Sequence, residues 1–191
     1  MRKVQANRAK MMARKTIEKG LVIVHTGTGK GKSSSAFGMV LRCVGHNFPV
    51  AIVQFIKGTW ETGEYNAITQ RFNDIVTFHR TGEGFTWDTQ DRERDILCAQ
   101  QGWALAKQLI TDPKYRMVLL DEINVAIGHG YIDPAEVTTF LDQHKPHMSH
   151  VVLTGRNAHP IILDHADLVS EMSSPKHPFK AGIKAQAGVE F

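Results

Sequence analysis

A glycine-rich segment at residues 25–33 constrains the fold of this 191-residue chain more than any other feature. It reads His-Thr-Gly-Thr-Gly-Lys-Gly-Lys-Ser, between the apolar run Leu21–Val24 and a stretch of small residues with helical character. Glycines permit a tight turn in which backbone N–H groups approach an anion. The N-terminus of a following helix favours the same negative charge. The pattern therefore predicts a phosphate-binding loop and a nucleotide as ligand.

The residues of this loop have separate expected roles. Lys32 supplies a mobile cation, and the hydroxyl of Ser33 suits Mg²⁺. The segment departs from the common G-x-x-x-x-G-K-[ST] pattern, because Thr26 occupies the first glycine position and a second lysine is present. The residues expected to hold the phosphates are Gly27, Thr28, Gly29, Lys30, Gly31, Lys32 and Ser33.

Apolar runs alternate with helical patterns along the chain, which predicts an α/β protein: a RecA-like phosphate-loop fold with a mostly parallel central sheet flanked by helices. The expected strands are Leu21–His25, Val50–Phe55, Ile75–His79, Met117–Asp121, His150–Thr154 and Leu168–Met172. The expected helices are Lys32–Val44, Asn66–Phe72, Gln90–Ile110, Pro134–His144 and Pro160–His165. Asp133 is the expected cap of the fourth helix, and Asp88 or Thr89 that of the third.

An apolar strand, Met117–Leu120, ends in two acids, Asp121 and Glu122. Downstream of a phosphate loop, such a strand end is typical of the Mg²⁺ site of phosphate-loop NTPases. Adjacent residues of a strand point to opposite faces, so we expect different roles for the two carboxylates. Which of them contacts Mg²⁺ is left open by the sequence, and both are candidate metal ligands together with Ser33.

Two aromatic residues, Phe85 and Trp87, stand between glycines in a loop that should follow the third strand. Loops are normally polar, so these rings need either burial in the core or a flat apolar ligand. Trp60 is a similar glycine-flanked aromatic in the loop after the second strand. Arg156, after the fifth strand, is a candidate phosphate ligand or a surface arginine.

Composition and charge limit the classes of protein to which the chain can belong. The chain has a formal net charge of +4, and seven Lys and Arg residues stand in the first twenty positions. We expect residues 1–20 to form a basic arm or lid and residues 21–191 a nucleotide-binding domain; the arm is equally compatible with a solvated helix. The chain has no apolar run that could span a membrane and no secretory signal. Two cysteines without metal-ligand spacing favour a reducing cytoplasm, and the histidines form no zinc pattern.

Taken together, the motifs resemble one family, the ATP:cob(I)alamin (corrinoid) adenosyltransferases of the phosphate-loop type. The resemblance covers the chain from about Gly20 to the C-terminus in consistent order. It rests on six segments: Thr26–Ser33, Val53–Gly58, Gly84–Gln90, Leu119–Glu122, Leu153–Arg156 and Lys184–Gly188.

The resemblance implies that cob(I)alamin attacks the 5′ carbon of ATP and that tripolyphosphate leaves. It implies that Phe85 and Trp87 press under the corrin ring and displace its lower axial ligand, and that the basic arm folds over the bound corrinoid. Mg²⁺ as cofactor, a homodimer and a flavoprotein reductant are further expectations from the resemblance. Neither nucleic acid nor a membrane is expected as a partner.

Other functions are compatible with parts of the pattern. The main alternative is a RecA-like ATPase acting on nucleic acid, suggested by Lys32, the acidic pair and the basic arm. In that case Glu122 activates water. A small-molecule kinase is a further alternative, although the chain shows no evident arginine-rich lid of the kind such kinases carry. A non-catalytic nucleotide-binding module is another.

Overall fold

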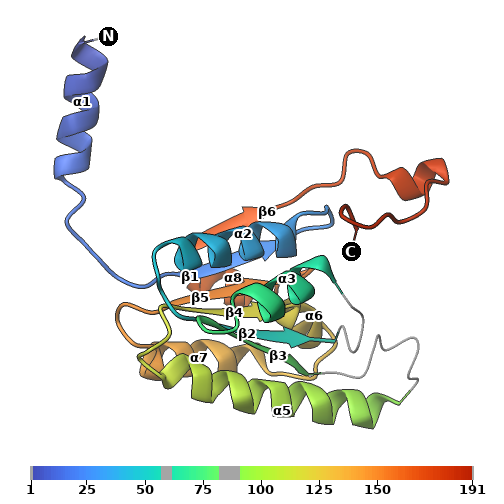
Figure 1. Ribbon diagram of the computed structural model, residues 1–191. Coiled ribbons are helices and arrows are strands. Elements are labelled where there is room, and N and C mark those ends of the chain that lie inside the picture. Colours follow the sequence, from blue (N-terminus) through green and yellow to red (C-terminus); the bar gives the residue numbers. More distant parts are fainter. Residues whose placement is uncertain (1, 57–61, 82–90, 191) are drawn as a thin grey trace.

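The computed structural model describes residues 2–56, 62–81 and 91–190. These residues form one six-stranded sheet and the helices around it (Figure 1). The sheet order is β3-β2-β4-β5-β1-β6, and every neighbouring pair is parallel. The predicted α/β phosphate-loop fold is confirmed, with a sheet that is entirely rather than mostly parallel. The strands are β1 Val22–Thr26, β2 Val50–Phe55, β3 Val76–Thr81, β4 Met117–Asp121, β5 His150–Thr154 and β6 Leu168–Glu171.

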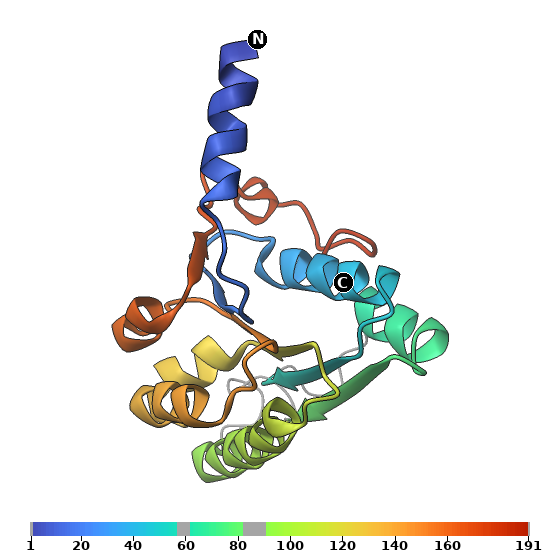
Figure 2. The same cartoon turned by 90° about the vertical axis from the view of Figure 1, so that its left-hand side faces the viewer.

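Helices cover both faces of the sheet (Figures 1 and 2). In Figure 1, α2 and α3 lie on one face, and α5 and α7 lie on the other. A 3₁₀ turn, Pro178–Ala181, follows β6 in the C-terminal tail. The helices are α1 Arg2–Ala13, α2 Lys32–Gly45, α3 Gly63–Arg71, α5 Arg92–Thr111, α6 Ile123–Gly128, α7 Pro134–His144 and α8 Pro160–His165.

Side chains that alternate along β1, β2, β4 and β5 supply two separate cores. On β4, Val118 and Leu120 join the cluster beneath α5, α6, α7 and α8, whereas Leu119 joins the cluster beneath α2 and α3. All three are fully buried. Strands β1, β2, β4 and β5 are covered on both faces and are largely apolar, which made them recognisable in the sequence, whereas the edge strands β3 and β6 are more polar and more exposed.

The expected elements agree with the structure except near their ends. Asp133 caps α7 as predicted, since its Oδ1 accepts a hydrogen bond from the N–H of Ala135 at 2.9 Å. The predicted cap of α5 at Asp88 or Thr89 is wrong: Asp91 caps this helix by accepting from the N–H of Arg94 at 3.1 Å. The short helix α6 was not expected, because its six residues give too little periodicity to separate from the strand before it.

The basic arm forms a helix that extends away from the sheet in both views (Figures 1 and 2). Its described apolar side chains are exposed, with Met11 at 61% and Met12 at 63%. The arm enters the domain at Gly20, which is buried and donates its N–H to the carbonyl oxygen of His147 at 2.6 Å. A Cβ atom at Gly20 would lie 2.0 Å from the carbonyl oxygen of Ser149, so only glycine fits there.

The amino end of β5 carries a half-buried histidine, His150. Its Nδ1 accepts a hydrogen bond from the N–H of Leu21 at 3.1 Å. Burial lowers the pKa of His150, and the positive charges of Arg116 and Lys145 lower it further. The histidine-rich segment around it holds no metal-binding cluster in the part of the chain that the structure describes.

Cys43 is buried and Cys98 is half-buried. Across residues 2–56, 62–81 and 91–190, every helix is too short or too polar to cross a membrane.

Candidate active site at the carboxyl end of the sheet

A cavity of about 240 Å³ lies around the loop between β1 and α2. Its walls come from elements that are far apart in the sequence. Gly29–Ser33 and Phe37 line it from the loop and α2, while Thr62 and Glu64 line it from the start of α3. Ligands of open α/β sheets bind beyond the carboxyl ends of the strands, which is where this cavity lies.

The tail after β6 packs against the glycine-rich loop. Gly27 has φ +97°, and a Cβ atom there would lie 2.4 Å from the carbonyl oxygen of Met172. The N–H of Gly29 donates to the same carbonyl at 2.6 Å. This N–H is therefore engaged with the tail, which helps to hold the loop in place.

Helix α2 begins at the cavity without a side-chain cap. Its N-cap residue, Gly31, has φ +106° and borders the cavity, with no atom within 4 Å of the position that a Cβ would take. The first N–H groups of a helix need partners, and an anion is well suited to accept from them. The helix start thus supplies partial positive charge to the cavity.

The first turn of α2 is tied to β1 by a buried histidine. His25 Nδ1 lies 2.8 Å from Ser35 Oγ and 3.3 Å from the carbonyl oxygen of Lys32. Lys32 itself is only 7% exposed, and its Nζ donates to the carbonyl oxygen of Gly29 at 2.5 Å. The ammonium group is consequently held across the loop, beside the position expected for the phosphates.

The two acids that follow β4 are placed differently. Asp121 is fully buried, and its oxygens accept hydrogen bonds from Gln54 Nε2 at 2.9 Å and Thr154 Oγ1 at 2.7 Å. Glu122 lines the cavity and adopts a left-handed backbone with φ +64°. Its N–H donates to Thr154 Oγ1 at 2.9 Å, so one threonine hydroxyl connects both acids.

Charges of both signs surround the cavity. Lys30, Lys32 and Arg156 line it, as do the carboxylates of Glu64, Glu122 and Glu190. Lys30 forms an ion pair with Glu190 of the C-terminal tail. With formal charges balanced three against three, a triphosphate needs added positive charge or movement of a carboxylate to bind strongly.

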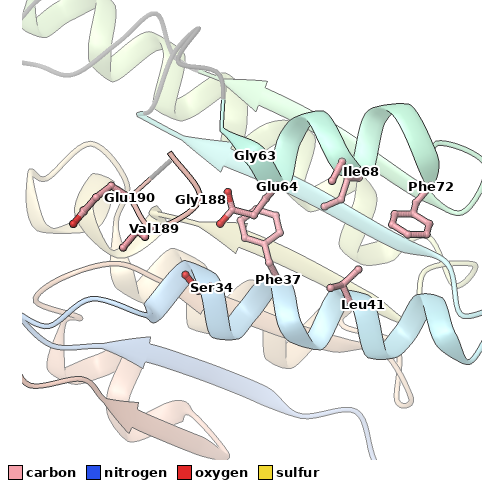
Figure 3. A pocket seen from close by; sticks show the side chains of 11 residues that line it. Ser34, Phe37, Leu41, Gly63, Glu64, Ile68, Phe72, Gly188, Val189 and Glu190 are labelled. Atoms are coloured by element: carbon pink, nitrogen blue, oxygen red, sulfur yellow. The ribbon is translucent and has the colours of Figure 1, made fainter. Parts of the chain in front are cut away.

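An apolar groove of about 380 Å³ continues from this cavity between α2 and α3. Figure 3 shows Phe37 and Leu41 pointing from α2 towards Ile68 of α3 and Phe72, which follows that helix. Ser34, Phe37, Glu64, Val189 and Glu190 line both spaces, so the tail borders the cavity and the groove together.

The structure brings most of the predicted site residues together. Gly29, Lys30, Gly31, Lys32, Ser33, Glu122 and Arg156 all line the cavity. Among the described loop residues, Gly27 and Thr28 lie outside its lining, and Asp121 lies within the protein interior. Phe85 and Trp87, like Trp60, fall outside the described residues.

Several residues of the cavity were not expected from the sequence, among them Gln54, Glu64 and Glu190. Gln54 is a polar residue in an otherwise apolar strand and lies in the segment Val53–Gly58 of the family resemblance, and these two signals could have revealed it. Glu64 and Glu190 carry no such signal, because charged residues in a helix start and in a polar tail are ordinary.

The chain is similar to known proteins of one family. The family model of ATP:corrinoid adenosyltransferase BtuR/CobO/CobP matches residues 18–191. A corrinoid adenosyltransferase of Sinorhizobium sp is 58% identical over 191 residues, which cover all of this chain and 89% of the relative. Corrinoid adenosyltransferases of Pseudomonas aeruginosa and Escherichia coli K12 are 55% and 45% identical over 174 residues, covering 91% of this chain and 85% and 87% of theirs. The chain belongs to the ATP:corrinoid adenosyltransferase family.

Proposed function

We propose that this corrinoid adenosyltransferase transfers the 5′-deoxyadenosyl group of ATP to the cobalt of a reduced corrinoid and releases tripolyphosphate. In this reaction cobalt(I) supplies the electron pair of the new cobalt–carbon bond. The bond between C5′ and the phosphate oxygen breaks, and tripolyphosphate leaves with its electrons. The observation that carries the proposal is the cavity in which Lys30, Lys32 and Arg156 surround the start of α2.

Once a bound cation offsets the three carboxylates, this cavity suits a leaving group that carries several negative charges. Lys32 and the first N–H groups of α2 stabilise charge that develops as tripolyphosphate departs. Because cobalt(I) is itself the nucleophile, the reaction needs no protein base. The protein must instead align cobalt, C5′ and the leaving oxygen at near-attack distance.

The donor set of the cavity fits Mg²⁺, a hard cation that prefers oxygen ligands. Ser33 and Glu122 line the cavity and are the proposed protein ligands. Asp121 accepts hydrogen bonds on both oxygens and lies away from the lining, so we assign it the role of holding the neighbouring strands. When bound, Mg²⁺ neutralises part of the triphosphate charge.

The corrinoid side of the reaction is proposed from the family. Phe85 and Trp87 are proposed to displace the lower axial ligand, which makes cobalt(II) easier to reduce. The groove between α2 and α3 provides apolar surface beside the cavity. The exposed apolar residues of the arm provide further apolar surface. We further propose residues 1–20 as a lid over the corrinoid, a homodimer, a flavoprotein reductant and a cytoplasmic location.

The family match favours adenosyl transfer over the alternative of an ATPase acting on nucleic acid. Incubation with ATP, Mg²⁺ and chemically reduced cobalamin should yield adenosylcobalamin and tripolyphosphate in equal amounts. The variant Lys32→Ala should lose the activity, and Lys176→Ala, in the exposed tail, serves as a control for removal of a lysine. ADP and phosphate as the main products, without a cobalt–carbon bond, contradict the proposal.

A further inference from the structure

Gln54 is a buried polar residue at the carboxyl end of β2. It is 2% exposed and lines the cavity that also contains Lys32, Ser33 and Glu122. Its carboxamide has a fixed orientation, because Nε2 donates to Asp121 Oδ2 at 2.9 Å. A carboxylate oxygen accepts hydrogen bonds, so the amide nitrogen and not the amide oxygen must face Asp121.

The amide oxygen of Gln54 has no hydrogen-bond partner among the described residues. Buried polar atoms are nearly always paired in native proteins, by protein, water or ligand. Asn124 is the other described residue with unpaired buried side-chain atoms, but it does not line the cavity. Gln54 thus combines a buried, unpaired acceptor with a place in the wall of the proposed ATP site.

The chemistry of the proposed ligand limits what can satisfy this oxygen. Phosphate oxygens and the carboxylate of Glu122 are acceptors, as Gln54 Oε1 is. A partner must be a donor, and bound Mg-ATP offers two kinds: water on the metal ion, and the hydroxyl or amino groups of the nucleoside.

We propose that Gln54 is a substrate-positioning residue whose Oε1 accepts a hydrogen bond from a donor of the bound Mg-ATP complex. This inference rests on the proposed function. The bond to Asp121 holds the carboxamide so that Oε1 stays available, and Asp121 is held in turn by Thr154 Oγ1. This hydrogen bond then helps to fix the orientation of the nucleotide before the corrinoid reacts.

The test uses Gln54→Met, which has a similar shape and lacks both the acceptor and the amide nitrogen that donates to Asp121. Calorimetry measures the dissociation constants of wild type and variant for three ligands: Mg-ATP, Mg-tripolyphosphate, and ATP with EDTA. We expect Gln54→Met to bind Mg-ATP about fivefold more weakly, the loss typical of one neutral hydrogen bond. Thermal unfolding of the unliganded variant establishes that it is folded.

The other two ligands identify the donor. Weaker binding of Mg-tripolyphosphate with unchanged binding of metal-free ATP supports metal-bound water. The reverse result supports a donor of the nucleoside. Equal losses for all three ligands indicate a general distortion through Asp121 and overturn the proposal, as does an unchanged dissociation constant for Mg-ATP.

A second measurement needs no variant. In the wild-type protein, the side-chain amide signals of Gln54 in a ¹⁵N NMR spectrum should shift when Mg-ATP is added, and unshifted signals contradict the contact. A wild-type protein that binds no Mg-ATP contradicts the proposed function itself. Wild-type binding with no effect of the variant contradicts only the role of Gln54.

Discussion

The hydroxyl of Thr154 offers the sharpest test of how the site is held together. It is fully buried, donates to Asp121 Oδ1 at 2.7 Å and accepts from the N–H of Glu122 at 2.9 Å. The variant Thr154→Val keeps the shape of the side chain but removes both hydrogen bonds. Thr154→Ser keeps the hydroxyl and loses only a methyl group.

The expected magnitudes of these two changes differ. A hydrogen bond to a carboxylate contributes about 1.5–3 kcal/mol and a neutral one about 0.5–1.5 kcal/mol, so Thr154→Val should lower the free energy of unfolding by about 2–4 kcal/mol. Thr154→Ser removes one methyl group from a packed site and should cost about 1 kcal/mol.

A functional effect should accompany the loss of stability. Glu122 has φ +64°, a conformation that costs about 1–2 kcal/mol for a residue with a side chain. Its hydrogen bond to Thr154 helps to hold that backbone. Without it, the Glu122 carboxylate should be less well placed, and the Mg²⁺ concentration for half-maximal activity should rise in Thr154→Val.

Urea unfolding followed by circular dichroism gives the free energies, and a Mg²⁺ titration of adenosylcobalamin formation gives the midpoints. Thr154→Ser should resemble the wild type in its metal titration. If both variants lose the same stability, or if Thr154→Val leaves the Mg²⁺ midpoint unchanged, the hydroxyl does not couple the two acids as described.

Three further predictions follow from the charges and rings of the protein. Glu190→Gln releases Lys30 from its ion pair, so the dissociation constant for tripolyphosphate should fall about two- to fivefold, and weaker binding would show instead that the carboxylate assists the ligand. The pKa of folded His150 lies below that of the unfolded chain, so the unfolded chain gains its proton first and stability should fall as the pH drops below about 6.5. Denaturant titrations at pH 7.5 and 5.5 should show a smaller difference in the free energy of unfolding for His150→Asn than for wild type. An equal difference would show that His150 does not cause the pH dependence. Phe85→Ala and Trp87→Ala should impair adenosylation started from cobalt(II) far more than that started from prepared cobalt(I), whereas equal losses would remove their role at the axial ligand.

Much of the fold was predictable because its four inner strands are covered on both faces. The run Met117–Leu120 is continuously apolar, and a strand of this kind stands out from any surrounding pattern. The ends of helices were less predictable, since several capping residues compete within a few positions. At the start of α5, Asp91 caps the helix although two earlier residues have suitable side chains.

The candidate site was predictable only where a local segment carries the chemistry. Lys32, Ser33 and the start of α2 lie in one stretch of sequence, so the spacing of its residues predicted their common role in phosphate binding. That Asp121 and Glu122 differ in role was expected, but which of them lines the cavity was not predictable, because the place of Asp121 depends on Thr154 and Gln54, which come from other strands.

The sequence by itself determined the phosphate-binding loop, the parallel sheet and the family, since each is recorded in short motifs or in apolar periodicity. Only the tertiary structure decided which atoms around the cavity are engaged and which are open. The N–H of Gly29 is taken by Met172, Lys30 is paired with Glu190, and the amide oxygen of Gln54 is left without a partner. The physical reason is that hydrogen bonds and ion pairs depend on distances of a few ångströms between segments over a hundred residues apart, which no local pattern specifies.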